Sequence, residues 1–187
     1  MTRCDWAENA DDLMMHYHDY EWGVPTKDER ETFELMTLEM MQAGLSWQTV
    51  LNKRENFRAA FANFDVDRVA QFNDDDMVRL VNDAGIIRNK LKIKDTIHNA
   101  RQLVEWHHAG KTLNAYLWSF VGNQPVVNRY PTMADVPAQT PLSQQVSKAL
   151  KQAGFKFVGP TIVQSWLEAL GILDDHLAKC TVNHLGE

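Results

Sequence analysis

The chain has 187 residues, of which 44% are apolar, and a formal net charge of −6. This composition supports a substantial core and excludes a disordered protein, and the length fits one domain or two small helical lobes. No stretch approaches the roughly 20 apolar residues of a membrane span, and the first residues lack the apolar core of a signal peptide. Two cysteines at opposite ends of the chain do not make a disulfide framework. We therefore expect a cytoplasmic protein.

The negative charge is unevenly distributed along the chain. Residues 5–39 hold eleven acidic and two basic side chains, so the remainder is slightly basic. Five basic residues and a single acidic one lie within residues 85–101, and Lys148, Lys151 and Lys156 form a second basic cluster. Each cluster is either a solvated helix face or a surface for a phosphate backbone, which binds largely through basic side chains.

Helix signals dominate the first part of the chain. The segment YHDYEWGVP at 17–25 has weak helical periodicity, and we expect it to be a loop. Thr26-x-x-Glu29 then has the form of a capping box, which predicts a helix with a methionine-rich buried face that ends near Gly44. Ser46 is placed to cap the next helix, which carries Trp47.

The rest of the chain continues the helical pattern. Further helices are predicted after the caps Asp65 and Asn73, over residues 89–110, between Pro141 and Gly154, and over residues 160–170 before Gly171. No strand alternation competes with these signals. The predicted fold class is therefore all-α.

Two cysteines and two histidines near the chain ends form a candidate metal set. Cys4 and His18 lie near the start, whereas His176 and Cys180 lie near the end, at a spacing that one helical turn would place on one face. Thiolate and imidazole suit zinc in a closed tetrahedron, and four protein ligands leave no position for a catalytic water. The spacing alone leaves open two unrelated thiols and two surface histidines.

An acidic residue and several aromatic residues form a second candidate site. Glu39 lies among methionines on the first long predicted helix, and Tyr17, Tyr20, Trp22 and Trp47 flank that helix in the sequence. A carboxylate near aromatic rings is what a pocket for a flat, positively charged base requires, because the rings stack and the carboxylate accepts hydrogen bonds. The alternative is a set of ordinary core tryptophans with Glu39 on the helix surface.

The segment DAGIIRNKLKI at 83–93 has the form of a helix-hairpin-helix, with a helix end, a hairpin centred on Gly85 and a basic helix start. Hairpin amides and the N-terminus of the second helix can bind a phosphate without reading base sequence. Arg88, Lys90 and Lys92 would add positive charge there. A glycine after one helix and a polar start of the next are also common in helical proteins generally.

Taken together, these motifs resemble the 3-methyladenine DNA glycosylase I family of the helix-hairpin-helix superfamily. The resemblance spans nearly the whole chain. It is carried by RCDW at 3–6, YHDYEWGVP at 17–25, QAGLSWQTVLNKRENFR at 42–58, DAGIIRNKLKI at 83–93, WSFVGNQP at 118–125, SKALKQAGFKFVGPTI at 147–162, and the terminal His176 and Cys180.

The resemblance implies a role for individual residues. One structural zinc per chain would be held by Cys4, His18, His176 and Cys180. Glu39 and Tyr17 would hydrogen-bond the flipped 3-methyladenine, Trp47 would stack on it, and Trp6 and Trp22 would wall the pocket. Gln42, Gly44 and Leu45 match the loop that enters the gap left in the duplex, where an apolar wedge replaces lost stacking.

The expected function is monofunctional hydrolysis of the bond between 3-methyladenine and its sugar in double-stranded DNA, with the free base as product. We expect a monomer whose base pocket lies between two helical lobes of the single domain 1–187. Met14 and the stretch Gln164-Ser165-Trp166 depart from residues common in the family, which bears on fine base selectivity. The alternatives are a non-catalytic, zinc-stabilised DNA-binding module and a zinc hydrolase with an open metal position.

Overall fold

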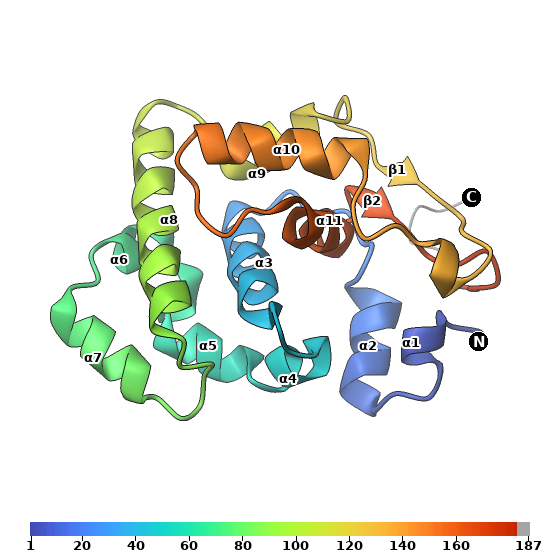
Figure 1. Cartoon of the computed structure of the whole chain (residues 1–187), viewed down its shortest axis with the longest axis horizontal. Coiled ribbons are helices and arrows are strands. Elements are labelled where there is room, and N and C mark those ends of the chain that lie inside the picture. Colours follow the sequence, from blue (N-terminus) through green and yellow to red (C-terminus); the bar gives the residue numbers. More distant parts are fainter. Residues whose placement is uncertain (183–187) are drawn as a thin grey trace.

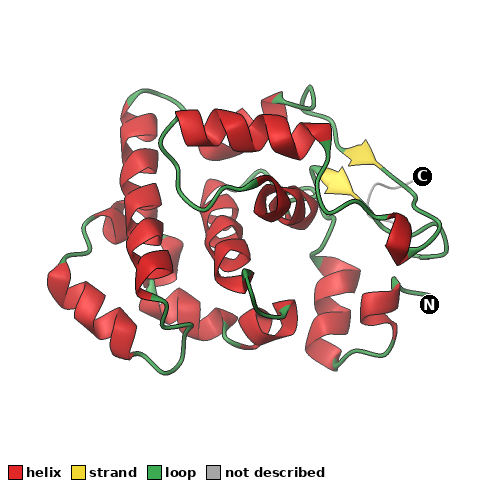
Figure 2. Cartoon of the chain, viewed as in Figure 1, coloured by secondary structure: helices red, strands yellow, loops and turns green. Residues whose placement is uncertain are grey.

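Most of the chain is helical, as expected. The structure is a computed structural model that describes residues 1–182 (Figures 1 and 2). Its first half contains α1 (Asp5–Glu8), α2 (Asp12–Tyr20), α3 (Glu29–Gln42), α4 (Trp47–Asn52), α5 (Arg54–Ala60), the 3₁₀ turn η1 (Ala62–Phe64), α6 (Val66–Ala70) and α7 (Asp74–Asn82). The second half contains α8 (Lys90–His108), α9 (Leu113–Ser119), β1 (Val126–Val127), the 3₁₀ turn η2 (Met133–Asp135), α10 (Pro141–Gln152), α11 (Pro160–Ala169) and β2 (Leu173–Asp174).

Helix α3 lies at the centre of the molecule (Figure 1). It packs against α4, α8, α9 and α11, and every residue from Thr32 to Met41 is buried. The predicted methionine face is thus only part of its buried surface, since a helix enclosed by neighbours has no solvent side. Polar side chains on α3, including Glu39, are therefore held inside the protein.

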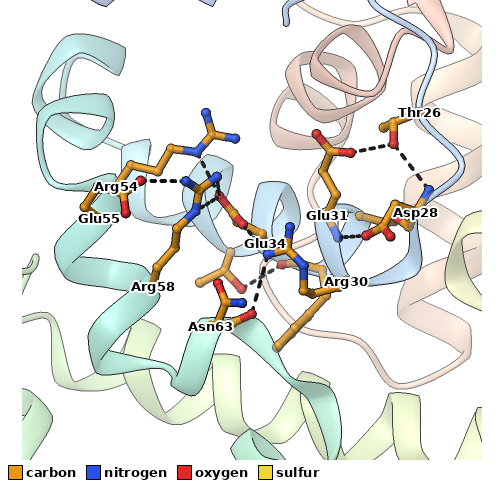
Figure 3. A network of polar contacts seen from close by, with 12 residues as sticks. Thr26, Asp28, Arg30, Glu31, Glu34, Arg54, Glu55, Arg58 and Asn63 are labelled. Carbon is orange, nitrogen blue, oxygen red and sulfur yellow. Dashed lines mark hydrogen bonds and ion pairs between the residues drawn. The ribbon is translucent and has the colours of Figure 1, made fainter.

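The start of α3 differs from the predicted capping box. The N-cap is Asp28, whose Oδ1 accepts a hydrogen bond of 2.7 Å from the backbone N–H of Glu31. Thr26 donates its hydroxyl to the Glu31 carboxylate instead (Figure 3). Asp28 caps the helix because an aspartate also satisfies the free N–H groups of the first turn and its charge is favoured there.

The segment 17–25 is only partly a loop, so that expectation was wrong for its first residues. Helix α2 continues to Tyr20 after Asp11, whose side chain caps it by accepting from the backbone N–H of Met14. Met14, Tyr17 and His18 are buried at the spacing of one helix face. The helix therefore directs Tyr17 and His18 inward from adjacent positions.

Other local signals are confirmed. The side chains of Ser46, Asp65, Asn73 and Thr140 accept hydrogen bonds at the starts of α4, α6, α7 and α10. Gly171 follows α11 with φ +65°, and a Cβ there would lie 2.3 Å from the carbonyl carbon of Val24. Only glycine permits this close approach of two chain segments.

Helices α7 and α8 are joined by a short turn over residues 83–89, as predicted. The side chain of Asn89 caps α8 by accepting from the backbone N–H groups of Leu91 and Lys92. Helix α8 has 19 residues, but neither it nor any other helix in the described part is long and apolar enough to cross a membrane.

A small strand pair was not predicted. β1 and β2 run parallel, with Val126 paired to Leu173 and Val127 paired to Asp174 (Figure 2). Two-residue strands show no alternation in the sequence, so the pairing arises from tertiary contact. It attaches the segment after α9 to the residues that lead into His176.

Candidate active site and metal centre

A cavity of about 280 Å³ lies among α1, α2, α3, α4 and α11. This volume is near the lower end for small-molecule sites. Its wall combines aromatic rings with carboxyl groups. The remaining lining residues are Met14, Gln42, Met133, Val136 and Ser165.

The aromatic wall consists of Trp6, Tyr17, Trp22 and Trp47. The ring centroids of Tyr17 and Trp47 are 5.3 Å apart, and those of Trp6 and Trp22 are 5.2 Å apart. Such distances are typical of interacting ring pairs, so the rings support one another. The structure thus gathers these four predicted pocket residues from three helices and one loop.

Glu39 lines the same cavity and is only 5% exposed. Burial raises the pKa of its carboxyl group to about 8. No group in the described part of the chain donates a hydrogen bond to it, which is costly for a buried carboxylate. Glu39 is therefore not a surface residue, and its carboxyl group is available to an occupant of the pocket.

Two further acidic residues, which no sequence motif predicted, line the cavity. Glu168 lies on α11 and Asp175 follows β2. The amide of Gln164 donates to both carboxyl groups, at 2.9 and 3.3 Å. Two features of the sequence could have indicated Glu168: Gln164 departs from the residues common in the family, and Glu168 is an acid within the apolar stretch WLEALGIL. Only the fold brings Asp175 beside Glu168.

Three of the four predicted metal ligands come together from the two chain ends. Ligand atoms of Cys4, His18 and Cys180 all lie within 4.8 Å of one another. The ring of His176 lies 5.1 Å from that of His18, measured between centroids. His176 and Cys180 do not share a helix, because residues 175–180 form a loop and turn after β2. Cys4, His18 and Cys180 thus meet through tertiary packing, with a donor chemistry that suits zinc, and His176 packs against His18 outside that group of three.

Each histidine of this cluster is oriented by a carboxylate. Nδ1 of His18 lies 2.9 Å from Oδ1 of Asp19, and Nδ1 of His176 lies 2.6 Å from Oδ1 of Asp174. Metal-binding histidines characteristically use one ring nitrogen in this way and present the other to the ion. Burial raises the pKa of the Cys4 thiol to about 12, and a bound cation would favour the thiolate.

A buried ion network holds α3 against its neighbours. Glu34 on α3 accepts from Arg54 and Arg58 on α5, each at 2.8 Å (Figure 3). Arg54 also pairs with Glu21 at 2.5 Å, and Glu21 immediately precedes Trp22 in the chain. The same guanidinium therefore connects the helix that carries Glu39 to the segment that carries the pocket residue Trp22.

The loop after α3 carries the predicted wedge. Leu45 is 46% exposed although it is apolar, and Gly44 has φ +84°. Gln42, the last residue of α3, lines the cavity. The structure thus places Gln42 in the pocket wall, and the loop that follows carries Leu45 three residues further along the chain with its side chain accessible.

The residues of the turn 83–89 and the start of α8 fall into two groups. Arg88 and Lys90 are exposed, and the carbonyl of Gly85 accepts a hydrogen bond from Asn56 at 3.1 Å. Lys92 is buried, and its Nζ donates to the carbonyls of Met41 and Ala43, at 3.2 and 2.7 Å. This geometry corrects the expected phosphate contact of Lys92, because its ammonium group satisfies the carboxyl end of α3.

The fold and the cavity define a helical protein with a buried aromatic and acidic ligand pocket. The family model described as methyladenine glycosylase matches residues 6–184. The DNA-3-methyladenine glycosylase 1 of Escherichia coli (strain K12) is 48% identical over 180 residues, 96% of either chain. The chain therefore belongs to the methyladenine glycosylase family, which confirms the resemblance seen in its motifs.

Solved structures agree with this assignment. A crystal structure of 3-methyladenine DNA glycosylase I is 46% identical, with a TM-score of 0.93 and coverage of 96% of this chain and 98% of that one. A tyrosine-to-phenylalanine variant of 3-methyladenine DNA glycosylase I, solved in complex with 3-methyladenine, is 35% identical, with a TM-score of 0.91 and 97% coverage of both chains. These relatives are named as 3-methyladenine DNA glycosylases, which is the enzyme class expected from the sequence.

Proposed function

We propose that this protein is a DNA repair glycosylase that removes 3-methyladenine from alkylated DNA. The observation that carries the proposal is Glu39, a buried carboxyl group without a described hydrogen-bond partner in an aromatic pocket. The names of the relatives, and the 3-methyladenine complex of one structural neighbour, support this choice of base.

The pocket suits an alkylated base flipped out of the duplex. Methylation of adenine at N3 makes the base cationic within DNA. The ring of Trp47 offers stacking and cation–π attraction, and Glu39 accepts hydrogen bonds from the base. Tyr17, which is buried beside Trp47, offers its hydroxyl as a further partner.

The cationic base needs little acid catalysis to depart. As the bond between the sugar C1′ and the base breaks, its electron pair moves onto the base and neutralises the positive charge. Water adds to C1′ and loses a proton to solvent, which completes the hydrolysis. No lysine lines the cavity in the described part of the chain, so we expect hydrolysis without a Schiff-base intermediate.

The surface beside the pocket suits double-stranded DNA. We propose that α7, the turn 83–89 and α8 act as a helix-hairpin-helix around Gly85. The Gly85 N–H itself donates to Asp83 at 2.7 Å, so the other amides of the turn bind a phosphate while Arg88 and Lys90 add charge. Leu45 then enters the gap that the flipped base leaves. We propose one domain with the base pocket between two helical lobes, which acts as a monomer in the cytoplasm.

The cluster of Cys4, His18, His176 and Cys180 would hold one structural zinc. These two thiols and two imidazoles would complete a tetrahedral set, which joins the two ends of the chain. The ion would contribute stability by cross-linking segments distant in sequence. The reacting groups of the pocket lie outside this set.

A release assay on methylated DNA tests the function. Wild-type protein should free 3-methyladenine, identified by chromatography, from duplex DNA treated with a methylating agent. A pure DNA-binding module would retard the DNA without freeing base. Excision of 7-methylguanine at a comparable rate would contradict a pocket that selects 3-methyladenine.

A further inference from the structure

The pocket contains an acidic pair that the proposed contacts of Glu39 do not explain. Glu168 projects from α11, and Asp175 lies just after β2, so neither shares a helix with Glu39. The pocket is thus lined by three carboxyl groups from three separate segments of the chain.

The two carboxyl groups share a hydrogen bond with each other, and their other hydrogen-bond partners are neutral amides. The side-chain amide of Gln164 lies between Glu168 and Asp175, and the amide of Asn128 donates to Asp175 at 2.7 Å. Among the described residues, no lysine or arginine lines this cavity. The pair therefore has no cationic side chain of the pocket beside it.

Other buried carboxylates of the protein are paired with arginine side chains. Glu34 is paired with Arg54 and Arg58, and Asp174 is paired with Arg129 at 2.9 Å. A buried carboxylate is costly without a counter-charge, and arginine is the usual partner. Among the described residues, the pocket carboxyl groups are thus the buried acids that no arginine neutralises.

The electrostatics of the pocket agree with this contrast. Burial, with Asp175 as a second cause, raises the pKa of Glu168 well above its ordinary value, and Glu39 adds to the shift. Negative charge on Glu168 is therefore disfavoured in the empty pocket. A positively charged occupant would favour it.

We infer that Glu168, supported by Asp175, is a second specificity-determining residue that makes the pocket prefer a cationic purine to a neutral purine of the same shape. The inference rests on the proposed function, because it concerns the base that the pocket accepts. Unmodified adenine is neutral, so a charge-dependent contact distinguishes it from 3-methyladenine in DNA independently of the methyl group. Discrimination of this kind comes from the difference between two binding free energies.

Two small ligands isolate the charge. One is the 3,9-dimethyladenine cation, whose charge is permanent, and the other is its neutral analogue with carbon in place of the methylated ring nitrogen. Binding can be followed by intrinsic fluorescence, because Trp6, Trp22 and Trp47 line the cavity. The quantity of interest is the ratio of the two dissociation constants at one pH and ionic strength.

Glu168→Gln should weaken binding of the cation about tenfold and leave the neutral analogue within about twofold of wild type. Glu168→Asp, which keeps the charge, should retain most of the preference. Glu105→Gln is the matched control, because Glu105 is exposed on α8 and the net charge changes equally. Circular dichroism and zinc content establish that each variant is folded, and Asp175→Asn supplies the same test if Glu168→Gln does not fold.

The outcomes separate this inference from the proposed function. An unchanged ratio in both Glu168→Gln and Asp175→Asn, or equal loss of both ligands, would overturn the role of Glu168 while 3-methyladenine release by wild type upheld the function. A wild-type protein that released no 3-methyladenine and bound the two ligands equally would overturn both.

Discussion

The indole ring of Trp22 packs edge-on against the imidazole ring of His176, with centroids 4.6 Å apart. Trp22 also stacks on His18 at 6.1 Å and contacts Trp6, which lines the cavity. One tryptophan thus belongs to the pocket wall and to the packing of the Cys/His cluster. Disturbing that cluster should therefore disturb the pocket, although its thiols lie outside the reacting groups.

Cys180→Ser should reduce bound zinc from one per chain to a small fraction. Loss of the cross-link should lower the melting temperature by about 10 °C and weaken binding of 3-methyladenine. Atomic emission, thermal melts and fluorescence titration measure the three effects. His16→Ala is the control, because His16 is an exposed histidine two positions from His18. Full metal content and wild-type melting in Cys180→Ser would contradict the zinc site.

Removal of the metal distinguishes a structural from a catalytic ion. A chelator should lower the melting temperature, and base release should fall only as the protein unfolds. Activity lost from protein that remains fully folded would instead favour the zinc hydrolase with an open metal position.

Glu39→Gln should change how stability depends on pH. Because burial raises the pKa of Glu39 from 4.5 to about 8, the folded protein binds this proton more tightly than the unfolded chain. Its contribution to stability is full below about pH 4.5 and is lost as the pH rises to about 8. The variant should therefore gain about 2 to 4 kcal/mol relative to wild type between pH 5 and pH 8.5.

Urea unfolding at a series of pH values measures this difference, with Glu105→Gln as the control for the charge change. Above about pH 8, where Glu39 is ionised, the same Glu39→Gln protein should bind 3-methyladenine at least about tenfold more weakly, because a hydrogen bond to a charged acceptor is lost. A stability difference independent of pH would contradict the buried, titrating carboxyl group, and unaltered binding and excision would contradict its role in recognition.

Lys92→Met and Arg88→Met should affect DNA binding differently. Nζ of Lys92 binds two carbonyls inside the protein, so its loss should cost about 1 to 3 kcal/mol of stability without changing the salt dependence of binding. Loss of Arg88 should lower the slope of log K against log salt by about one, as expected for one phosphate contact. Nonspecific duplex binding at several salt concentrations measures both slopes, and equal slopes for the two variants would contradict this assignment.

Leu45→Ala should separate base binding from base flipping. The exposed leucine should matter only when the duplex must be held open, so excision from duplex DNA should fall about tenfold while binding of free 3-methyladenine is unaltered. Val78→Ala is the control, because Val78 is an apolar residue on α7 that is 61% exposed. Equal loss of excision in both variants would show that Leu45 is not a specific wedge.

Local sequence determined the helices and most of their ends. Ser46, Asp65, Asn73 and Thr140 are confirmed as caps because a cap bonds to backbone only two or three residues away. The misplaced start of α3 shows the limit of this reasoning. Threonine and aspartate are both common N-cap residues. The order of Thr26 and Asp28 along the chain therefore does not decide which one caps the helix.

The sequence motifs by themselves also identified the family, and with it the residues expected in the pocket and at the metal centre. Only the tertiary structure decided which of these groups are buried together. Glu39 has a raised pKa because four helices surround α3, and Lys92 turned inward because the carbonyls at the end of that helix lacked donors. No sequence pattern predicted that Glu168 and Asp175 would line the pocket. Burial depends on contacts between segments far apart in the chain, which no local pattern records.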